Sequence, residues 1–149
     1  KTFDSERALY GSRGVTVRRC GFDGPADGES AFKESADIVA EDCFFNLRYP
    51  FWHDRNVAVR RSDMTENCRA ALWYSEDITI EDTKMHGIKA LRECRNARLE
   101  RCDIISPEFG WSTAPYCATV RRRASTFSCA PRISICAACA SAASILFSI

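Results

Sequence analysis

The sequence predicts an all-β protein, a right-handed parallel β-helix (solenoid) of about five to six coils. The first observation is an internal repeat: segments 12–22, 35–45, 54–64, 75–85 and 94–104 align with one another at offsets of 23, 19, 21 and 19 residues. The second is that each segment holds an apolar alternation too short for a helix. A strand that recurs every 20 residues or so, with no helix to make a crossover, is most simply stacked on its own next copy. The crossover rule favours the right-handed form.

The alternation assigns an inward and an outward side to each strand. Val15 and Val17 share one side of the first strand, and Thr16 takes the other. In a solenoid, equivalent positions form ladders with about 4.8 Å between coils. We expect five interior ladders: Val15/Ile38/Val57/Ile78/Ala97, Val17/Ala40/Val59/Ile80/Leu99, Cys20/Cys43/Ser62/Thr83/Cys102, Phe22/Phe45/Met64/Met85/Ile104 and Leu9/Phe32/Phe51/Leu72/Leu91. A leucine-rich repeat is the rival solenoid, but its Leu and Asn spacing is absent.

The stretch before each strand supplies the best candidate site. It reads ALYG at 8, AFKE at 31, PFWH at 50, ALWY at 71, ALRE at 90 and FGWS at 109. If the residue at the position of Phe51 faces inward, the next one faces outward. We name the resulting outer ladder the aromatic column: Tyr10, Lys33, Trp52, Trp73, Arg92 and Trp111, with His53 and Tyr74 beside it.

The aromatic column supports two interpretations. Aromatic faces about 5 Å apart, interleaved with Lys and Arg, can stack against sugar rings or against one another through cation–π contacts, and the first of these predicts carbohydrate binding or modification. Like residues also stack for stability in β-helices, or cover a partner interface, which predicts a non-catalytic structural or interaction scaffold. Whether the protein is an enzyme stays open at this stage, and no catalytic residue is assigned.

The sequence offers many Asp and Glu residues as candidate catalytic acids and bases. Asp27, Glu29, Glu66 and Glu108 fall in or near loops, and a carboxylate pair held about 5 to 9 Å apart can hydrolyse a glycoside. No clustered Asp ladder marks a calcium site, the Cys136/Cys139 pair lacks a second pair with zinc spacing, and no glycine-rich nucleotide motif occurs. We therefore expect no metal and no cofactor.

Several blocks resemble a known family: DGPADGES (23–30), NLRYPFWH (46–53), CRAALWYS (68–75), MHGIKALREC (85–94) and CDIISPEFGW (102–111). They resemble a bacterial family of uncharacterised parallel β-helix proteins, a domain of unknown function within the pectin-lyase-like fold, over about residues 3–111. The resemblance implies the fold and further coils in the intact relatives. It implies no activity, substrate or catalytic residue.

The composition changes near Trp111. From Thr113 to Ile149 there is no Asp, Glu, Lys or Gly, and Ala and Ser supply 15 of 37 residues. We expect a β-helix over residues 1–112 and a poorly structured, out-of-frame tail over 113–149, because permitted codons for 122–129, displaced by two bases, read ESEYVLL. The tail is expected to offer the last coil no matching strand, so that the chain self-associates through that uncapped end. Sequencing the DNA across codons 105–149 tests the frameshift.

Net charge and hydropathy give expectations about the partners and the location of the protein. A net charge of +1 implies no nucleic-acid partner, and no apolar stretch of membrane-spanning length occurs. The start lacks the pattern of a signal peptide, so we expect a cytoplasmic protein. Its nine cysteines are then expected to be mostly free thiols that pack as small apolar groups.

Overall fold

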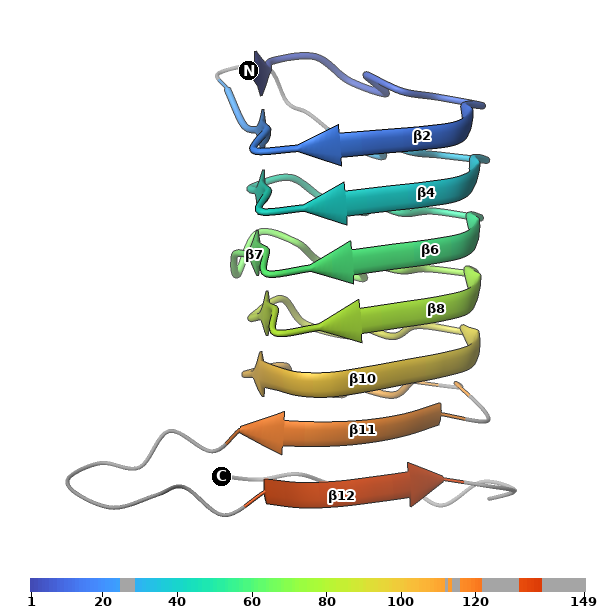
Figure 1. The fold of residues 1–149 in the computed structure, drawn as a ribbon, viewed down its shortest axis with the longest axis vertical. Helices are drawn as coiled ribbons and strands as arrows, with labels where there is room; N and C mark the ends of the chain where they lie inside the picture. The colour runs from blue at the N-terminus through green and yellow to red at the C-terminus, as the bar shows by residue number, and fades with distance from the viewer. Residues whose placement is uncertain (25–28, 112, 114–115, 122–131, 138–149) are drawn as a thin grey trace, which may run out of the picture.

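The computed structural model describes residues 1–24, 29–111, 113, 116–121 and 132–137, and Figure 1 shows these as a column of stacked strands. The long strands that form the front wall are β2 (Arg13–Arg18), β4 (Ala36–Glu41), β6 (Arg55–Arg60), β8 (Glu76–Glu81) and β10 (Arg95–Ile104). The short strands of a second wall are β1 (Thr2–Phe3), β3 (Gly21–Phe22), β5 (Phe44–Phe45), β7 (Asp63–Met64) and β9 (Lys84–Met85). The elements assigned in these residues are strands, and no helix long and apolar enough to cross a membrane is found among them.

The front wall confirms the predicted register. Val15 lies opposite Ile38, Ile38 opposite Val57, and Val57 opposite Ile78, in parallel pairs. The second inward-facing position of each strand has the same register, since Val59 pairs with Ile80 and Ile80 pairs with Leu99. In Figure 1 the front strands run from right to left and the chain returns behind them as it descends, which makes the solenoid right-handed. The structure thus contains a parallel β-solenoid of about five turns.

Left-handed backbone conformations form the corners of each coil. One such corner is the position of Asp37, Asn56, Asp77 and Asn96, whose φ angles lie between 52° and 59°. In the first coil Gly14 takes that position, with φ of 64°. A single residue with positive φ bends an extended chain sharply, and Gly, Asn and Asp accept this conformation most readily. Three further corners of the same kind recur in every coil, including the one at Arg61.

The interior is the predicted set of ladders. Phe32, Phe45, Phe51 and Leu72 are fully buried, and only the ladder members near the ends of the column, such as Leu9 and Ile104, are partly buried. Phe32 stacks on Phe51 with ring centroids 5.1 Å apart and planes 7° from parallel. The ring separation follows the spacing between coils, which a sheet fixes at about 4.8 Å.

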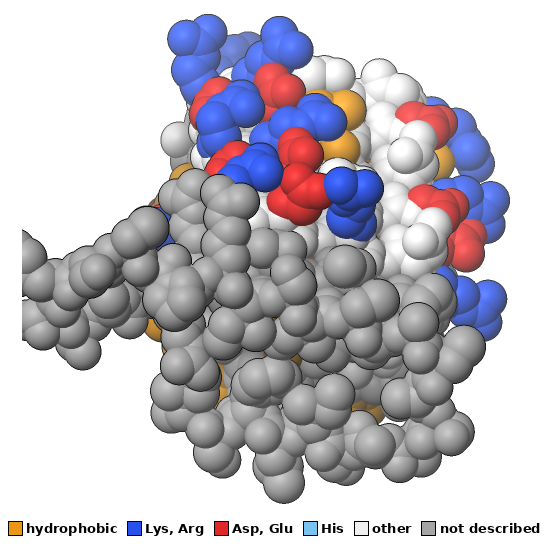
Figure 2. Space-filling view, turned by 60° about the horizontal axis from the view of Figure 1, so that its bottom comes forward, with side chains coloured by type: hydrophobic (Ala, Val, Ile, Leu, Met, Phe, Trp, Pro, Cys, Tyr) orange, Lys and Arg blue, Asp and Glu red, His pale blue; other side chains and the backbone are white. Residues whose placement is uncertain are grey.

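The charges of the long strands alternate from one coil to the next, a feature that the sequence repeat alone did not reveal. Strands β2, β6 and β10 are basic overall, and β4 and β8 are acidic. Arg60 of β6 contacts both neighbours, with Nε 2.9 Å from Glu81 and Nη1 3.4 Å from Glu41. Figure 2 shows Lys and Arg side chains interleaved with Asp and Glu on the described surface. Since like charges directly opposite destabilise a sheet, the alternation helps to fix which coil follows which.

The end of the chain differs from expectation in one respect. The prediction that the tail provides no strand for the last coil is wrong for residues 116–121: β11 (Tyr116–Arg121) pairs with β10 in parallel. The stack then reverses direction, because β12 (Arg132–Ala137) pairs with β11 antiparallel. A six-residue strand needs only backbone groups to extend a ladder, so an irregular sequence does not prevent it. The frameshift and the domain boundary at 112 stay predictions, and most of the tail lies outside the described residues.

Candidate functional site

The aromatic column forms as predicted through its central four members. Trp52 and Trp73 stack with ring centroids 5.0 Å apart and planes 6° from parallel. The Lys33 ammonium lies 4.2 Å from the centroid of Trp52, and the Arg92 guanidinium carbon lies 4.1 Å from that of Trp73. The two tryptophans are therefore enclosed between two cations. Each contact is a cation–π interaction of about 0.5 to 2 kcal/mol, depending on desolvation.

The ends of the column are organised differently from its centre. Tyr10 is 53% exposed and donates its hydroxyl to Glu34 Oε2 at 2.7 Å instead of stacking. Trp111 is 45% exposed, and Lys89 Nζ lies 4.0 Å from its ring centroid. Residues 10 and 111 are thus at the positions the prediction gave them, but neither belongs to the stack of Lys33, Trp52, Trp73 and Arg92.

His53 and Tyr74 form a smaller contact beside the column. Their ring centroids lie 4.9 Å apart in an edge-on arrangement, and Tyr74 is 45% exposed. A hydrogen bond with Glu93 raises the pKa of the Tyr74 phenol, so the neutral phenol persists to higher pH than usual. This pair supplies an exposed aromatic edge with a carboxylate next to it.

Tyr49 completes the column and was not predicted. Its ring packs against both indoles, 5.9 Å from the centroid of Trp52 and 5.3 Å from that of Trp73. The indole nitrogens of the two tryptophans are buried without a hydrogen-bond partner. Alternation along a strand does not predict this position, because Tyr49 is a corner residue with φ of 52° and its side chain leaves the chain in a different direction.

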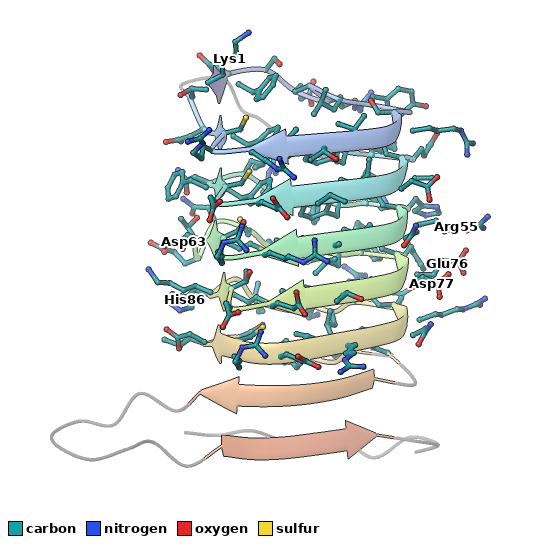
Figure 3. All side chains as sticks on the ribbon, in the orientation of Figure 1. Lys1, Arg55, Asp63, Glu76, Asp77 and His86 are labelled. Carbon is teal, nitrogen blue, oxygen red and sulfur yellow. The ribbon has the colours of Figure 1, made fainter. Side chains whose placement is uncertain are left out.

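The loop carboxylates are dispersed among separate contacts. Glu29 lies 3.6 Å from Arg48, Glu108 lies 3.3 Å from Lys89, and Glu66 is exposed. Asp27 lies outside the described residues. Among the described residues no group of three or more His, Cys, Asp or Glu is arranged to hold a metal ion. Figure 3 shows Asp63 and His86 on the side of the short strands and Arg55, Glu76 and Asp77 at the start of the long ones.

A ladder of buried polar residues contains Asp54, the described carboxyl group whose pKa is shifted most. Asp54 is 1% exposed, and its Oδ1 accepts the Ser35 amide at 2.8 Å while its own amide donates to Ser75 Oγ at 3.1 Å. Burial raises the pKa of Asp54 to about 8, partly offset by the Ser35 amide, and its Oδ2 lacks a partner. Ser35, Asp54 and Ser75 each accept, through a side-chain oxygen, the backbone N–H of the equivalent residue in the coil above. The sequence carried a signal, since Asp54 aligns with Ser12, Ser35, Ser75 and Cys94.

Five cysteines of the solenoid are free thiols, as predicted. Cys20, Cys43, Cys68, Cys94 and Cys102 form no disulfide. Burial raises the pKa of Cys68 and of Cys94 to about 12, so both are neutral and poorly nucleophilic at neutral pH. Each Sγ also contacts a backbone carbonyl of the coil above, that of Phe45 for Cys68 and that of Leu72 for Cys94. These residues act as small packing groups.

Comparison with known proteins gives a family without an activity. No curated protein and no solved structure matches the sequence. One family model, described as protein of unknown function DUF3737, matches residues 1–128. The match is longer than the range of 3–111 expected from the resemblance, and it includes the stretch that contains β11. It covers more than half of the chain and coincides with the solenoid, so the protein belongs to the DUF3737 family of proteins of unknown function.

Proposed function

We propose that this protein is a non-catalytic solenoid scaffold and that its aromatic column is a packing element. The observation that carries the proposal is the enclosure of the two tryptophans between Lys33 and Arg92. A sugar ring binds an indole by lying on its face. Here each indole has one face on the other indole and the opposite face under a cation. A sugar would have to displace a cation–π contact in order to bind.

The edges of the rings support the same proposal. Sugar hydroxyls are usually recognised by polar groups that border the aromatic platform. The indole nitrogens of Trp52 and Trp73 are buried, and the ring of Tyr49 packs against both tryptophans. A ligand on the surface therefore meets neither nitrogen.

Carbohydrate binding or modification remains the second candidate. It is supported by Tyr10, Tyr74 and Trp111, which are 53%, 45% and 45% exposed and thus offer open ring surface. A site built on these residues lies at the ends and side of the column instead of on its stacked centre.

The double variant Trp52→Ala plus Trp73→Ala separates the two candidates. The scaffold proposal expects no glycan binding by the unaltered chain on a glycan array, and a loss of about 2 kcal/mol or more in the variant's free energy of unfolding. Glycan binding that disappears in the variant while the far-ultraviolet circular dichroism is unchanged would overturn it. The matched control, Tyr74→Ala plus Trp111→Ala, removes exposed rings and is expected to cost less stability.

A further inference from the structure

Two thiols are stacked on adjacent coils at one corner of the solenoid. Gly21 pairs with Phe44 in parallel, in the short strands β3 and β5. The Phe44 amide donates to the Cys20 carbonyl at 2.9 Å, so Cys20 and Cys43 occupy the same position of successive coils. The next coil carries Ser62 at this position, and its hydroxyl accepts the Cys43 amide at 3.1 Å. Both thiols are free, so they can act together as a two-sulfur ligand.

The two sulfurs take the same orientation. Cys20 Sγ lies 3.3 Å from the carbonyl oxygen of Arg18, and Cys43 Sγ lies 3.2 Å from that of Glu41, which is the equivalent residue of the next coil. Side chains with the same orientation on adjacent coils are separated by the rise of one coil, about 4.8 Å. The sulfurs therefore lie about one coil apart.

This separation suits a metal bridge better than a disulfide. A disulfide needs its sulfurs about 2.05 Å apart and its Cβ atoms about 3.8 Å apart, so forming one would require the coils to move. A thiolate–metal bond is about 2.3 Å long for zinc, so an ion with two opposed thiolates spans about 4.6 Å. One ion fits between the two sulfurs with little movement of the backbone.

The surroundings favour an ion that takes few ligands. Glu41 and Asp42 directly precede Cys43, but each carboxylate is held by an arginine: Arg18 Nε lies 2.8 Å from Glu41, and Arg61 Nε lies 2.8 Å from Asp42. Among the described residues no cluster of three or more His, Cys, Asp or Glu is arranged to hold a metal. Structural zinc takes four ligands, whereas thiolates select soft ions such as Cu(I), which is stable with two.

We propose that Cys20 and Cys43 together bind one Cu(I) ion as a two-coordinate thiolate site that joins two coils. Binding forms two Cu–S bonds and releases both thiol protons to solvent, so the bridge carries one net negative charge. Arg18 and Arg19 directly precede Cys20 and place positive charge nearby. The inference goes beyond the proposed scaffold role and does not depend on it, since neither cysteine belongs to the aromatic column.

The release of protons makes binding depend on pH. Burial raises the pKa of the Cys43 thiol, partly offset by the backbone of Cys20. Cys43 is 3% exposed, and its neutral thiol must lose a proton before it can bind the ion. The affinity for Cu(I) should therefore rise with pH through the neutral range.

The probe is Cu(I) itself, supplied without oxygen and with a reductant, in competition with the chromogenic chelator ferrozine. All chains compared carry serine in place of the four cysteines after residue 112, which are Cys117, Cys129, Cys136 and Cys139. We expect one Cu(I) per chain and an X-ray absorption spectrum with two sulfur neighbours. Hydrogen exchange of the amides of β3 and β5 should slow on binding, because the ion ties these strands together.

Single serine variants test the assignment of the ligands. Cys20→Ser and Cys43→Ser should each lower the Cu(I) affinity at least about a hundredfold, because one thiolate leaves a two-ligand site incomplete. Serine fits this position of the coil, as Ser62 shows. The matched control is Cys102→Ser, which replaces a thiol at the same position two coils beyond Ser62, where the neighbour above is Thr83. This control should leave the affinity unchanged.

Three results would overturn the proposal: no Cu(I) complex that competes with the chelator, unchanged affinity in Cys20→Ser or Cys43→Ser, or an equal loss in Cys102→Ser. Circular dichroism of each variant verifies that the solenoid is folded, so a loss of affinity can be assigned to the missing thiol. Failure here leaves the glycan test unaffected, since the two experiments use different residues and readouts.

Discussion

The phenylalanines inside the solenoid and the tryptophans outside it stack with the same geometry. Phe22 and Phe45 lie 5.0 Å apart and 9° from parallel, and Trp52 and Trp73 lie 5.0 Å apart and 6° from parallel. No ligand is needed to explain either pair, because both separations match the rise of one coil. Stacked aromatic rings on the outside of this fold are therefore weak evidence for a binding site.

What differs between the two stacks is how they end. The inner rings are covered by other apolar side chains, such as Phe51, which meets the edge of Phe45 at 5.3 Å. The outer rings are covered by the cations Lys33 and Arg92. Inside, stability comes from burial of apolar area; outside, it comes from ring stacking and weaker cation–π contacts at partly buried positions. Variants that remove one side chain from each environment can measure this difference.

The largest effect is expected from the inner stack. Phe51→Ala should lower the free energy of unfolding by about 3 to 5 kcal/mol, because Phe51 is fully buried and its removal leaves a cavity between Phe32 and Phe45. Phe51→Leu should cost far less, since leucine occupies the equivalent position at Leu72 and Leu91. Urea denaturation checks both values. Equal losses in the two variants would mean that ring stacking, not volume, matters inside.

The buried Asp54 gives the next effect, through pH. Its pKa is about 8 in the folded chain against 3.8 in the unfolded one, so between these values the folded state holds the extra proton. Stability from this group is complete below about pH 4 and is lost as the pH rises towards 8, by up to about 1.4 kcal/mol per unit. Asp54→Ser, which restores the residue of the neighbouring coils, should remove this slope.

Denaturation of the Asp54 variant between pH 5 and 9 makes the measurement. Asp37→Asn, which removes an exposed carboxyl and keeps a residue suited to positive φ, serves as the control and should retain the slope. A slope that is the same in the unaltered chain and in Asp54→Ser would show that the buried carboxyl does not hold a proton in this range.

The fold could be predicted from the sequence because the contacts of a solenoid follow the order of its repeats along the chain. Val15, Ile38 and Val57 could be placed over one another from spacing alone, since each coil pairs with the next copy of itself. The aromatic column could be predicted by the same step. The contacts of Tyr49 could not, because they depend on corner dihedrals and rotamers, which spacing does not determine.

The alternation of strand charge from coil to coil is also encoded in the sequence. It has a period of two coils, and a search for a single-coil repeat averages it away. The alternation does not continue into the tail. An acidic strand would be expected after the basic β10, but β11 (YCATVR) contains no acidic residue.

The smallest effect is expected at the end of the outer stack. Arg92→Gln removes the cation that lies 4.1 Å from the ring centroid of Trp73, and we expect it to cost about 0.5 to 1 kcal/mol in the free energy of unfolding. Arg95→Gln, at an exposed position three residues away, should be neutral within about 0.5 kcal/mol. The Arg92 variant also uncovers one face of Trp73. A gain in affinity for simple sugars that the unaltered chain does not bind would mean that the Arg92 cation excludes ligands from that ring face. Enclosure of the rings would then be the reason that this surface does not act as a carbohydrate site.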